Sequence, residues 1–356
     1  MKIASVVGAR PQFIKLAPLS HRLRKRHREV IIHTGQHYHD DLSEIFFREL
    51  KIPKPDYNLE VGSAEQGRQT GEMLIKLEEV LQFERPDWVL VYGDTNSTLA
   101  GALAASKLHI PLAHIEAGMR SYNNSMPEET NRKVADHLSQ LLFCTGQNPV
   151  SNLKKEGIIK GVYLVGDLMF EALAENFKIA LRKSRILKKL GLSAQNYYLI
   201  TIHRAENTDS KERLTELSKL LQKLDKKTIF PLHPRTRKYL RQYGLWSKLE
   251  GMKNLKLLEP VGYLEMLILE KNAKMVLTDS GGVQREAYFF GTPCVVLRGE
   301  TEWTEMLSKN FQLAKNFADL KLPTLSPRTR KKISNPPPVS QKIISILERE
   351  FISGKR

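Results

Sequence analysis

The sequence predicts an α/β protein made of two doubly wound halves, each built on a parallel sheet. Short apolar runs recur along all 356 residues and alternate with stretches of helical periodicity, which is the pattern of parallel strands joined by crossover helices. Polar and glycine residues follow directly after many of these runs, as they do where parallel strands end beside a ligand. A strand-free segment in the middle of the chain separates the two halves.

The predicted strands fall into two sets. The first set lies at 2–7, 29–34, 88–93, 111–115, 141–145 and 162–165. The second set lies at 197–202, 228–232, 255–258, 275–278 and 293–297. Each set contains enough strands for one doubly wound sheet.

The domain junction is predicted near 166–190, because the lysine-rich stretch 168–195 is helical in pattern and carries no strand signal. We expect an N-terminal domain at 1–168 and a C-terminal domain at 169–335. Three prolines follow Asn335, and the amphipathic stretch 339–351 then predicts a last helix. We expect this closing segment, 336–356, to pack back on the N-terminal domain.

The composition indicates a globular protein, with 41% hydrophobic and 27% charged residues. The longest apolar runs fall far short of the roughly 18 residues that a membrane-spanning helix needs. The N-terminus has the pattern of a strand rather than that of a signal peptide, so we expect a cytoplasmic protein with no membrane contact. Cys144 and Cys294 lie in apolar stretches and are expected to be buried, reduced thiols.

The formal net charge of +17 favours an anionic partner: a nucleic acid, a membrane surface or a phosphorylated small molecule. Much of the excess lies in the run 21–28 and in the last 36 residues. Neither stretch interleaves aromatic residues or matches a nucleic-acid-binding module, so we interpret them as a solvated helix end and a basic tail. No nucleic-acid partner is expected.

An anion site is predicted after the first strand. Gly8 makes a turn, Arg10 and Pro11 open a helix, and Lys15 follows one turn later. A helix N-terminus beside Arg and Lys suits an anion, although a plain strand-to-helix turn with exposed basic residues has the same pattern. The Gly-x-Gly-x-x-Gly spacing of a dinucleotide site is missing.

A nucleotide site is predicted after the strand at 275–278. Ser280, Gly281 and Gly282 open a helix there, and small residues let backbone N–H groups approach a phosphate closely. Glu286, one turn further, can accept hydrogen bonds from two ribose hydroxyls. A simple capped helix with a glycine turn is the alternative.

Candidate acids and bases follow strands of the first half. Asp94 and Glu116 each come after an apolar run, and Glu128, next to Glu129, starts a predicted helix. Partly desolvated carboxylates are the usual general acids and bases. Asp94 and Glu128 can instead cap helices, whereas Glu116 has no evident capping role.

Two histidines end strands of the second half. His203 and His233 stand beside Arg204 and Arg235, where they can bind a diphosphate or move a proton, although single histidines at strand ends are more often structural. The sequence contains no nucleophile triad, Walker loop or Cys/His metal spacing, so a metal ion is not expected.

Together, seven ordered motifs resemble those of the non-hydrolysing UDP-N-acetylglucosamine 2-epimerase family from residue 1 to about 307. They are Gly-Ala-Arg-Pro (8–11), His-Thr-Gly-Gln-His (33–37), Tyr-Gly-Asp-Thr-Asn-Ser-Thr (92–98), His-Ile-Glu-Ala-Gly (114–118), Met-Pro-Glu-Glu-x-Asn-Arg (126–132), Thr-Ile-His-Arg-Ala-Glu-Asn (201–207) and Asp-Ser-Gly-Gly-Val-Gln-x-Glu-Ala (279–287).

This resemblance implies a glycosyltransferase-B-like fold of two Rossmann-like domains with a cleft between them, no cofactor, and a homodimer. The nucleotide would be held mainly by the C-terminal domain. The implied reaction inverts C2 of a UDP-2-acetamido sugar, by elimination of UDP to a 2-acetamidoglycal and re-addition after protonation of the opposite face.

Residue by residue, the resemblance assigns Asp94, Glu116 and Glu128 to the proton transfers at C2 and their supporting hydrogen bonds. It assigns His203 to the departing UDP. Which carboxylate is the base and which the acid stays open, because coupled groups do not divide cleanly.

The same resemblance gives the nucleotide contacts. Arg10 and Lys15 would hold the diphosphate and sugar from the N-terminal side. Residues 280–282 would hold the phosphates from the other side, and Glu286 would hold the ribose.

Departures from the family pattern concern the substrate. The stretches 8–15, 165–169 and 286–291 look closest to the branch that acts on UDP-2,3-diacetamido-2,3-dideoxy-glucuronic acid, which makes a manno sugar for surface polysaccharides. Arg285 and Arg298 are then possible partners for the additional carboxylate. UDP-N-acetylglucosamine itself stays an equal alternative.

A regulatory second substrate site, present in some bacterial members, is not expected here. Gln36 and His37 match its pattern, but 38–40 and 66–76 diverge from it. We therefore predict little activation by UDP-N-acetylglucosamine.

Two other functional classes stay open. A glycosyltransferase of the same fold would use a UDP-sugar donor, but it would not explain three carboxylates together with His203. A non-enzymatic binder of nucleotide sugars or nucleic acid would account for the positive charge alone.

Overall fold

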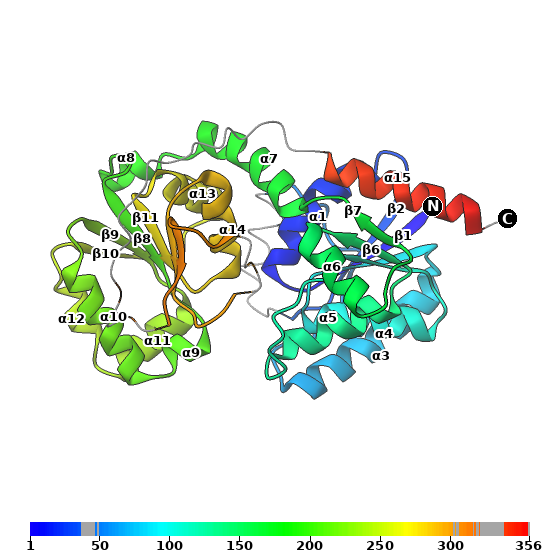
Figure 1. The fold of residues 1–356 in the computed structure, drawn as a ribbon, viewed down its shortest axis with the longest axis horizontal. Coiled ribbons are helices and arrows are strands. Elements are labelled where there is room, and N and C mark those ends of the chain that lie inside the picture. Colours follow the sequence, from blue (N-terminus) through cyan, green and yellow to red (C-terminus); the bar gives the residue numbers. More distant parts are fainter. Residues whose placement is uncertain are drawn as a thin grey trace. The chain divides into compact units, whose positions relative to one another are not determined.

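The computed structural model describes residues 1–36, 47, 50–301, 303, 306–315, 317, 320 and 338–354. The chain divides into two compact units. The first comprises Met1–Ala172 with Pro336–Arg356, and the second comprises Leu173–Asn335. Each unit is built on its own parallel sheet, which confirms the predicted α/β class (Figure 1).

The sheet of the first unit has the strand order β3-β2-β1-β4-β5-β6-β7, and every neighbouring pair is parallel. Its strands are β1 (Lys2–Val7), β2 (Arg28–His33), β3 (Tyr57–Asn58), β4 (Trp88–Tyr92), β5 (Leu112–Ile115), β6 (Leu141–Cys144) and β7 (Val162–Leu164). All but β3 lie where the apolar runs predicted them. The sequence missed β3 because a strand of 2 residues shows no periodicity.

Helices cover both faces of this sheet. They are α1 (Arg10–Leu23), α3 (Gln66–Glu84), α4 (Asn96–Lys107), α5 (Pro127–Leu138), α6 (Gln147–Lys155) and α15 (Val339–Gly354), with the start of α7 (Leu168–Lys183). Alternate residues of β1, Ala4 and Val6, pack with Met73 and Leu77 of α3 in one apolar core. Figure 1 shows α15 lying along α1.

The C-terminal helix is fixed to the first unit by a buried carboxylate. Glu171, at the start of α7, accepts hydrogen bonds from the backbone N–H (2.9 Å) and Oγ (2.7 Å) of Ser340. Its other partner is Arg22 of α1, with Nη1 at 2.8 Å from Oε1. The segment 338–354 therefore packs against the unit that contains residues 1–172.

The second unit repeats the architecture with the strand order β10-β9-β8-β11-β12-β13, again entirely parallel. Its strands are β8 (Tyr197–Thr201), β9 (Lys227–Pro231), β10 (Leu255–Leu258), β11 (Met275–Thr278), β12 (Cys294–Val296) and β13 (Phe311–Leu313). Only β13, a short edge strand, was not predicted.

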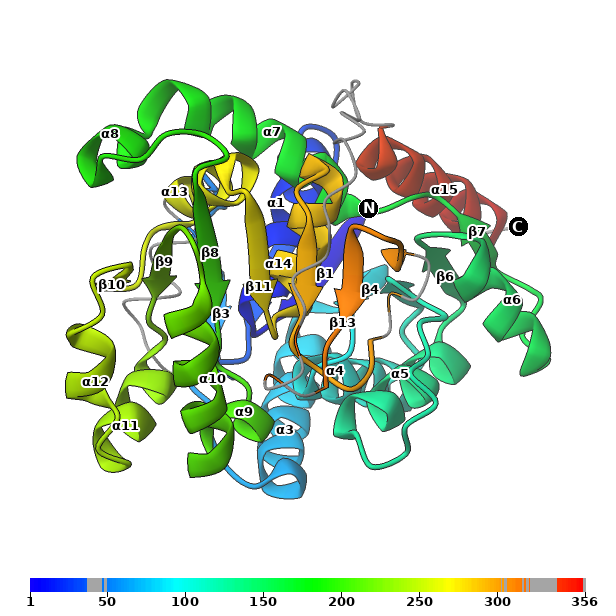
Figure 2. The same cartoon turned by 60° about the vertical axis from the view of Figure 1, so that its left-hand side comes forward.

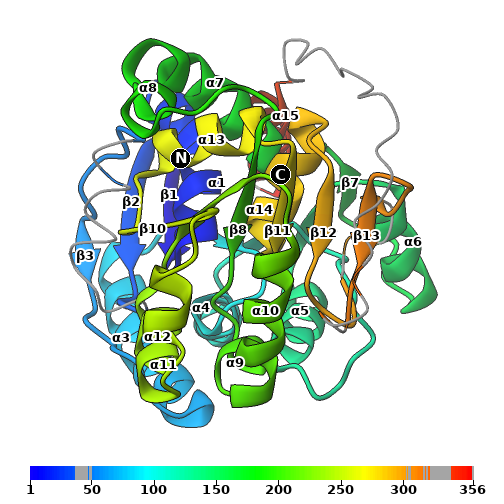
Figure 3. The same ribbon diagram turned by 90° about the vertical axis from the view of Figure 1, so that its left-hand side faces the viewer.

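Helices cover both faces of this second sheet (Figures 2 and 3), and two apolar cores hold them to it. One core contains Leu217, Leu240 and Leu249 from α10 (Lys211–Lys223), α11 (Pro234–Gln242) and α12 (Trp246–Glu250). The other contains side chains of three helices, α8 (Ile186–Leu190), α13 (Tyr263–Asn272) and α14 (Gly281–Phe290). The short α9 (Ala205–Thr208) follows β8.

Three further expectations concern the chain as a whole. Cys144 and Cys294 are buried free thiols, as predicted. In the described part of the chain, no helix has both the length and the apolar character to cross a bilayer. His37, the divergent residues 38–40 and the proline-rich stretch 321–337 lie outside the described residues.

Candidate functional site

The candidate catalytic residues of the first unit follow three adjacent strands. β1, β4 and β5 are neighbours, and the strand order reverses direction between β1 and β4. Ligands of doubly wound sheets bind at such a reversal, beyond the carboxyl ends of the strands. Arg10 follows β1 and is exposed at the first position of α1, Asp94 follows β4, and Glu116 follows β5. The structure thus brings these predicted residues to one edge of the sheet.

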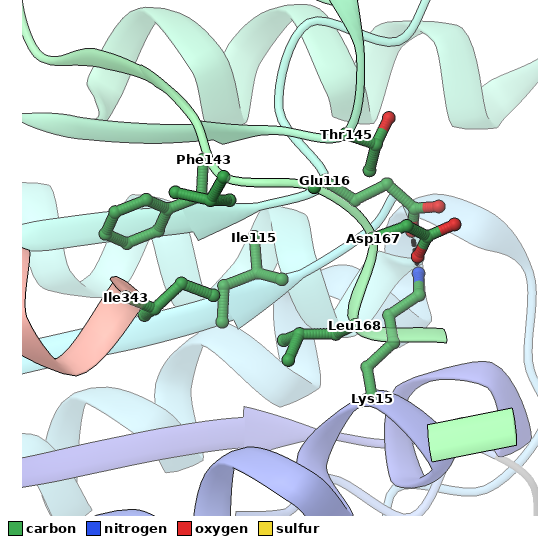
Figure 4. A pocket seen from close by; sticks show the side chains of 10 residues that line it. Lys15, Ile115, Glu116, Phe143, Thr145, Asp167, Leu168 and Ile343 are labelled. Carbon is green, nitrogen blue, oxygen red and sulfur yellow. Dashed lines mark ion pairs between the residues drawn. The ribbon is translucent and has the colours of Figure 1, made fainter. Parts of the chain in front are cut away.

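Lys15 and Glu116 form a buried ion pair at this edge. Figure 4 shows their side chains pointing toward one another, with Asp167 beside them. They are only 4% and 7% exposed, so the two charges depend on each other for solvation. Gly93 makes room for the pair: with φ +64°, a Cβ there would lie 3.1 Å from Lys15 Nζ.

The backbone of Glu116 is in the left-handed region, with φ +74°. This conformation costs a residue with a side chain roughly 1–2 kcal/mol, and such strain is concentrated at functional sites. The backbone N–H of Glu116 donates to the carbonyl of Phe143 at 3.1 Å, which helps to hold the turn. The strained turn directs the carboxylate toward Lys15 rather than into the sheet.

A cavity of about 10 Å³ borders the ion pair (Figure 4). Thr145 and Asp167 form part of its polar wall, and Phe143 and Leu168 contribute to the apolar side. Its volume suits about one water molecule. Asp167 Oδ1 also accepts from the backbone N–H of Met169 at 2.8 Å, at the start of α7.

Asp94 is bound by Arg132 of α5. Arg132 Nη2 lies 2.6 Å and Nε 3.0 Å from the same oxygen, Oδ2, and Asn131 Nδ2 donates to the Asp94 carbonyl at 2.9 Å. Burial opposes ionisation of this carboxyl, but the charges of Arg132 and Lys15 outweigh it and hold the pKa of Asp94 below its usual value. Asp94 is therefore a carboxylate at neutral pH.

Glu128 and Glu129 differ sharply although they are adjacent in the first turn of α5. Glu129 is 1% exposed and accepts hydrogen bonds from Ser121 and from Arg132 Nη1 (2.8 Å). Burial raises its pKa, but these donors outweigh burial and lower the pKa overall. Glu128 is partly exposed, and its carboxylate has no hydrogen-bond or ion-pair partner among the residues that the structure describes. It is thus available to a ligand.

In the second unit, Asp279 fixes the loop that carries His203. Asp279 follows β11, is fully buried, and accepts from the backbone N–H groups of His203 (3.1 Å) and Arg204 (3.0 Å) and from Asn207 Nδ2 (3.0 Å). His203 Nδ1 lies 3.2 Å from Asp279 Oδ1, whereas the ring is 38% exposed. A carboxylate at Nδ1 orients the ring.

His233 lies beside His203, with ring centroids 5.4 Å apart. Its Nδ1 accepts from the backbone N–H of Arg235 at 3.2 Å, so the ring caps α11. Arg235 itself pairs with Asp209, through Nη2 and Oδ2 at 2.5 Å. The two predicted histidines are therefore neighbours, and His233 has a structural role as the cap of α11.

The start of α14 has the geometry of an anion site. Ser280 is the N-cap, and the half-buried Gly281 and Gly282 occupy the first turn, where backbone N–H groups point outward. Glu286, one turn further along α14, is 2% exposed. Ser280, Gly281, Gly282 and Glu286 thus all belong to α14 or its N-cap.

The two arginines considered for a substrate carboxylate are both buried. Arg285 places its guanidinium 4.1 Å from the ring centroid of Trp303. Arg298 Nε lies 3.9 Å from Glu206 Oε1, near the outer limit of an ion pair. Both lie in the second unit.

The sequence alone does not identify the residues that bind and orient the predicted site residues. Arg132 belongs to the same motif as Glu128, but nothing in the sequence shows that it reaches Asp94. Asp279 directly precedes Ser280, and its position at a strand end was the available signal. His114 and Asp136, described below, gave no signal beyond membership of an apolar strand and a helix.

Comparison with known proteins gives the family. The model of the UDP-N-acetylglucosamine 2-epimerase family matches residues 21–316. A UDP-N-acetylglucosamine 2-epimerase homolog of Methanococcus maripaludis is 56% identical over 306 residues, covering 86% of each chain. The UDP-2,3-diacetamido-2,3-dideoxy-D-glucuronate 2-epimerase of Pseudomonas aeruginosa is 48% identical over 317 residues, covering 86% of each chain.

A solved structure has a similar backbone over nearly the whole length of this chain. The Methanocaldococcus jannaschii UDP-GlcNAc 2-epimerase, in complex with UDP-GlcNAc and UDP, superposes with a TM-score of 0.87 at 42% identity, covering 98% of this chain and 100% of that one. This likeness confirms the expected glycosyltransferase-B-like class with two Rossmann-like domains. The chain therefore belongs to the UDP-N-acetylglucosamine 2-epimerase family, and its enzyme class is that of the isomerases.

Proposed function

We propose that this chain is a non-hydrolysing 2-epimerase of a UDP-2-acetamido sugar. One observation carries the proposal: an ionised carboxylate, Asp94, and an ion-paired carboxylate, Glu116, follow adjacent strands at the point where the strand order reverses. Groups that accept and return a proton are what inversion of a C–H centre requires. Family membership supports a UDP-linked acetamido sugar as the substrate.

The reaction is an elimination followed by an addition. A carboxylate takes the proton from C2, the C2–H electron pair forms the C1–C2 double bond, and the C1–O bond breaks with its electron pair on the UDP oxygen. A proton then reaches the opposite face of C2 in the 2-acetamidoglycal, and the UDP oxygen bonds to C1 again. No redox cofactor takes part, since electrons and atoms balance between sugar and UDP.

The surroundings of the three carboxylates indicate different roles in the proton transfers. Asp94 is held ionised by Arg132 and Lys15, so it suits accepting a proton or stabilising positive charge rather than donating a proton. Glu116 and Glu128 are the groups that we assign to the other transfer. Glu128 has the better access, because its carboxylate is not bound within the described residues.

The second unit supplies the nucleotide-binding groups in this proposal. His203, oriented by Asp279, stabilises the charge on the departing UDP. Ser280, Gly281 and Gly282 bind phosphate oxygens at the start of α14, and Glu286 binds the ribose hydroxyls. We keep Arg10, Lys15 and His233 as diphosphate ligands.

Two sugars fit the proposal equally on similarity. The Pseudomonas aeruginosa UDP-2,3-diacetamido-2,3-dideoxy-D-glucuronate 2-epimerase and a Methanococcus maripaludis UDP-N-acetylglucosamine 2-epimerase are each 48% identical to this chain. Arg285 is a buried cation on α14 that stacks on Trp303, and its place on the helix whose start is assigned to the phosphates favours the uronic acid. Arg285→Glu should abolish any preference for the uronic acid, and Arg285→Lys should keep part of it. Unchanged discrimination between the two sugars in Arg285→Glu would remove this assignment.

The catalytic assignment is tested with isosteric variants. We expect Asp94→Asn and Glu116→Gln to lower the epimerisation rate by about 10²-fold or more, which is typical for loss of acid–base catalysis. UDP affinity, measured by calorimetry, should stay at the wild-type value. Glu72→Gln, which changes a carboxylate on the exposed part of α3, is the matched control and should have no effect. Wild-type rates in both site variants would refute the proposal.

The proposal also covers the oligomeric state, the cellular location and the biological role of the protein. We propose that the protein works as a homodimer in the cytoplasm and supplies a manno sugar for surface polysaccharides, as the resemblance implies. Light scattering on the purified chain tests the dimer, and a mass of one chain would contradict it. Loss of the surface polysaccharide on gene deletion would support the cellular role, and an unchanged polysaccharide would refute it.

A further inference from the structure

A buried histidine contacts the turn that carries Asp94 directly, and it contacts the turn after Glu116 through Asp136. His114, on β5, is fully buried. Its Nε2 lies 2.7 Å from the carbonyl oxygen of Gly93, and its Nδ1 lies 2.7 Å from Asp136 Oδ1 of α5. The proposed reaction does not use this ring directly.

The partners of His114 determine its protonation. A neutral imidazole has one donor nitrogen and one acceptor nitrogen. The Gly93 carbonyl can only accept, and the Asp136 carboxylate also accepts from Arg120 Nη1 (2.7 Å) and from the Gly118 backbone N–H (3.1 Å). With these partners both ring nitrogens of His114 are placed to donate, which is the hydrogen bonding of an imidazolium.

The surrounding charges balance this cation. Arg120 bridges Asp136 and Glu156, with Nε and Nη2 each 2.7 Å from a Glu156 oxygen. The network then contains two cations, His114 and Arg120, and two anions, Asp136 and Glu156. A buried charge persists where it is paired and hydrogen-bonded in this way.

His114 and its carboxylate partner Asp136 each bind one of two glycine turns. Gly93, directly before Asp94, has φ +64°, and Gly118, two residues after Glu116, has φ +78°. The Gly93 carbonyl is held by the His114 ring itself, whereas the Gly118 N–H is held by Asp136, the other partner of the ring.

We propose that His114 is a positioning residue, whose doubly hydrogen-bonded ring fixes the separation of Asp94 and Glu116 and places a positive charge behind the Asp94 carboxylate. The inference rests on the proposed epimerase function for its kinetic consequence, but not for the protonation of the ring. It differs from a purely structural role, because the charge of the ring acts on Asp94.

The charge of His114 shifts the pKa of Asp94 in a defined direction. Three cations face Asp94 from three elements: Arg132 of α5, Lys15 of α1 and His114 of β5, and all three lower its pKa. The carboxylates of Glu116 and Glu129 share Lys15 and Arg132 with it and oppose this effect. Removing the His114 charge should therefore raise the pKa of Asp94 and move the acid limb of the rate profile to higher pH.

The kinetic test uses His114→Gln, whose amide can still donate to Gly93 but carries no charge. We expect kcat to fall between about 10-fold and 10²-fold, as for a modest displacement of catalytic groups, with KM for the UDP-sugar unchanged. The acid limb should move upward. His137→Gln, the same change at an exposed position of α5, is the matched control and should leave both unchanged. An acid limb that stays in place in His114→Gln overturns the proposal.

A second measurement needs neither activity nor the variant. Nitrogen NMR of the wild-type protein with labelled histidine should show protons on both His114 ring nitrogens at neutral pH. A neutral tautomer at neutral pH would overturn the proposal even if His114→Gln does not fold. Failure of the wild-type protein to epimerise either sugar would refute the proposed function alone, because the ring protonation is read separately.

Discussion

Arg132 is the residue whose loss should be felt most strongly in the first unit. It is 2% exposed and serves two carboxylates, Asp94 and Glu129. Arg132→Met keeps the length and the apolar part of the side chain but removes the charge. Glu129 would then be a buried carboxylate without its cation.

The expected magnitude follows from what remains around Glu129. Removing one partner of a buried ion pair typically costs 3–5 kcal/mol, because the other charge is left uncompensated. Glu129 keeps the N–H (2.9 Å) and Oγ (3.0 Å) of Ser121 and the N–H of Tyr122 (3.1 Å), so we expect the lower end, about 3 kcal/mol. Asp94 adds little, because its side chain is 34% exposed and water screens it.

The loss should depend on pH in a defined direction. The pKa values of Glu129 and Asp94 are lowered in the folded protein, so their ion pairs stabilise it above the unfolded values of about 4 and lose this effect as the pH falls through the folded values. The difference between wild type and Arg132→Met should therefore be full at neutral pH and shrink in acid. Arg132→Lys, which keeps the charge but not the planar fork, should lose less.

Hydrogen exchange of the β4 and β5 amides under increasing urea measures the unfolding free energy of the first unit by itself. We expect the loss of about 3 kcal/mol for Arg132→Met at neutral pH and a clearly smaller one in acid well below about pH 4. A loss below about 1 kcal/mol, or one that does not change with pH, would refute the reasoning about a buried, uncompensated Glu129.

Three other changes have expected outcomes. Gly93→Ala forces a side chain into the left-handed region near Lys15 Nζ, so the unfolding free energy in urea should fall by about 1–2 kcal/mol and the epimerisation rate should fall with it; a neutral effect would contradict the close packing. Asp279→Asn weakens the orientation of His203 and leaves a buried donor without its acceptor, so kcat should fall and the melting temperature should fall moderately; an unchanged kcat in the folded variant would refute the orienting role. Glu171→Gln removes the charge that holds the C-terminal helix, so limited proteolysis should release α15 faster, at a cost in stability of about 2 kcal/mol; unchanged cleavage would refute this role.

Much of the fold could be predicted because its signals are local. Buried parallel strands are continuous apolar runs, and the polar residues after them mark the carboxyl edge of the sheet. The missed strands, β3 and β13, have 2 and 3 residues and are held by their neighbours rather than by their own pattern. The break between α7 and α8, at 184–185, also has no strong sequence signal.

The candidate site could be predicted only at the level of residue types and order. Asp94 and Glu116 lie on strand ends, so their position follows from the sheet. The contrast between Glu128 and Glu129 depends on which side of the first turn of α5 faces the core, and that is a tertiary property. The partners Arg132 and His114 come from elements whose packing the sequence does not reveal.

The central claim is that the protein inverts C2 by elimination and re-addition of UDP. Proton NMR of the purified protein with UDP-N-acetylglucosamine in D₂O, run beside UDP-2,3-diacetamido-2,3-dideoxy-glucuronic acid, tests it most directly. The account predicts a manno product with deuterium at C2 from at least one of the two sugars. A manno product that keeps its original hydrogen at C2, or no turnover of either sugar by protein that still binds UDP, would contradict it, and the second result would favour a glycosyltransferase of the same fold.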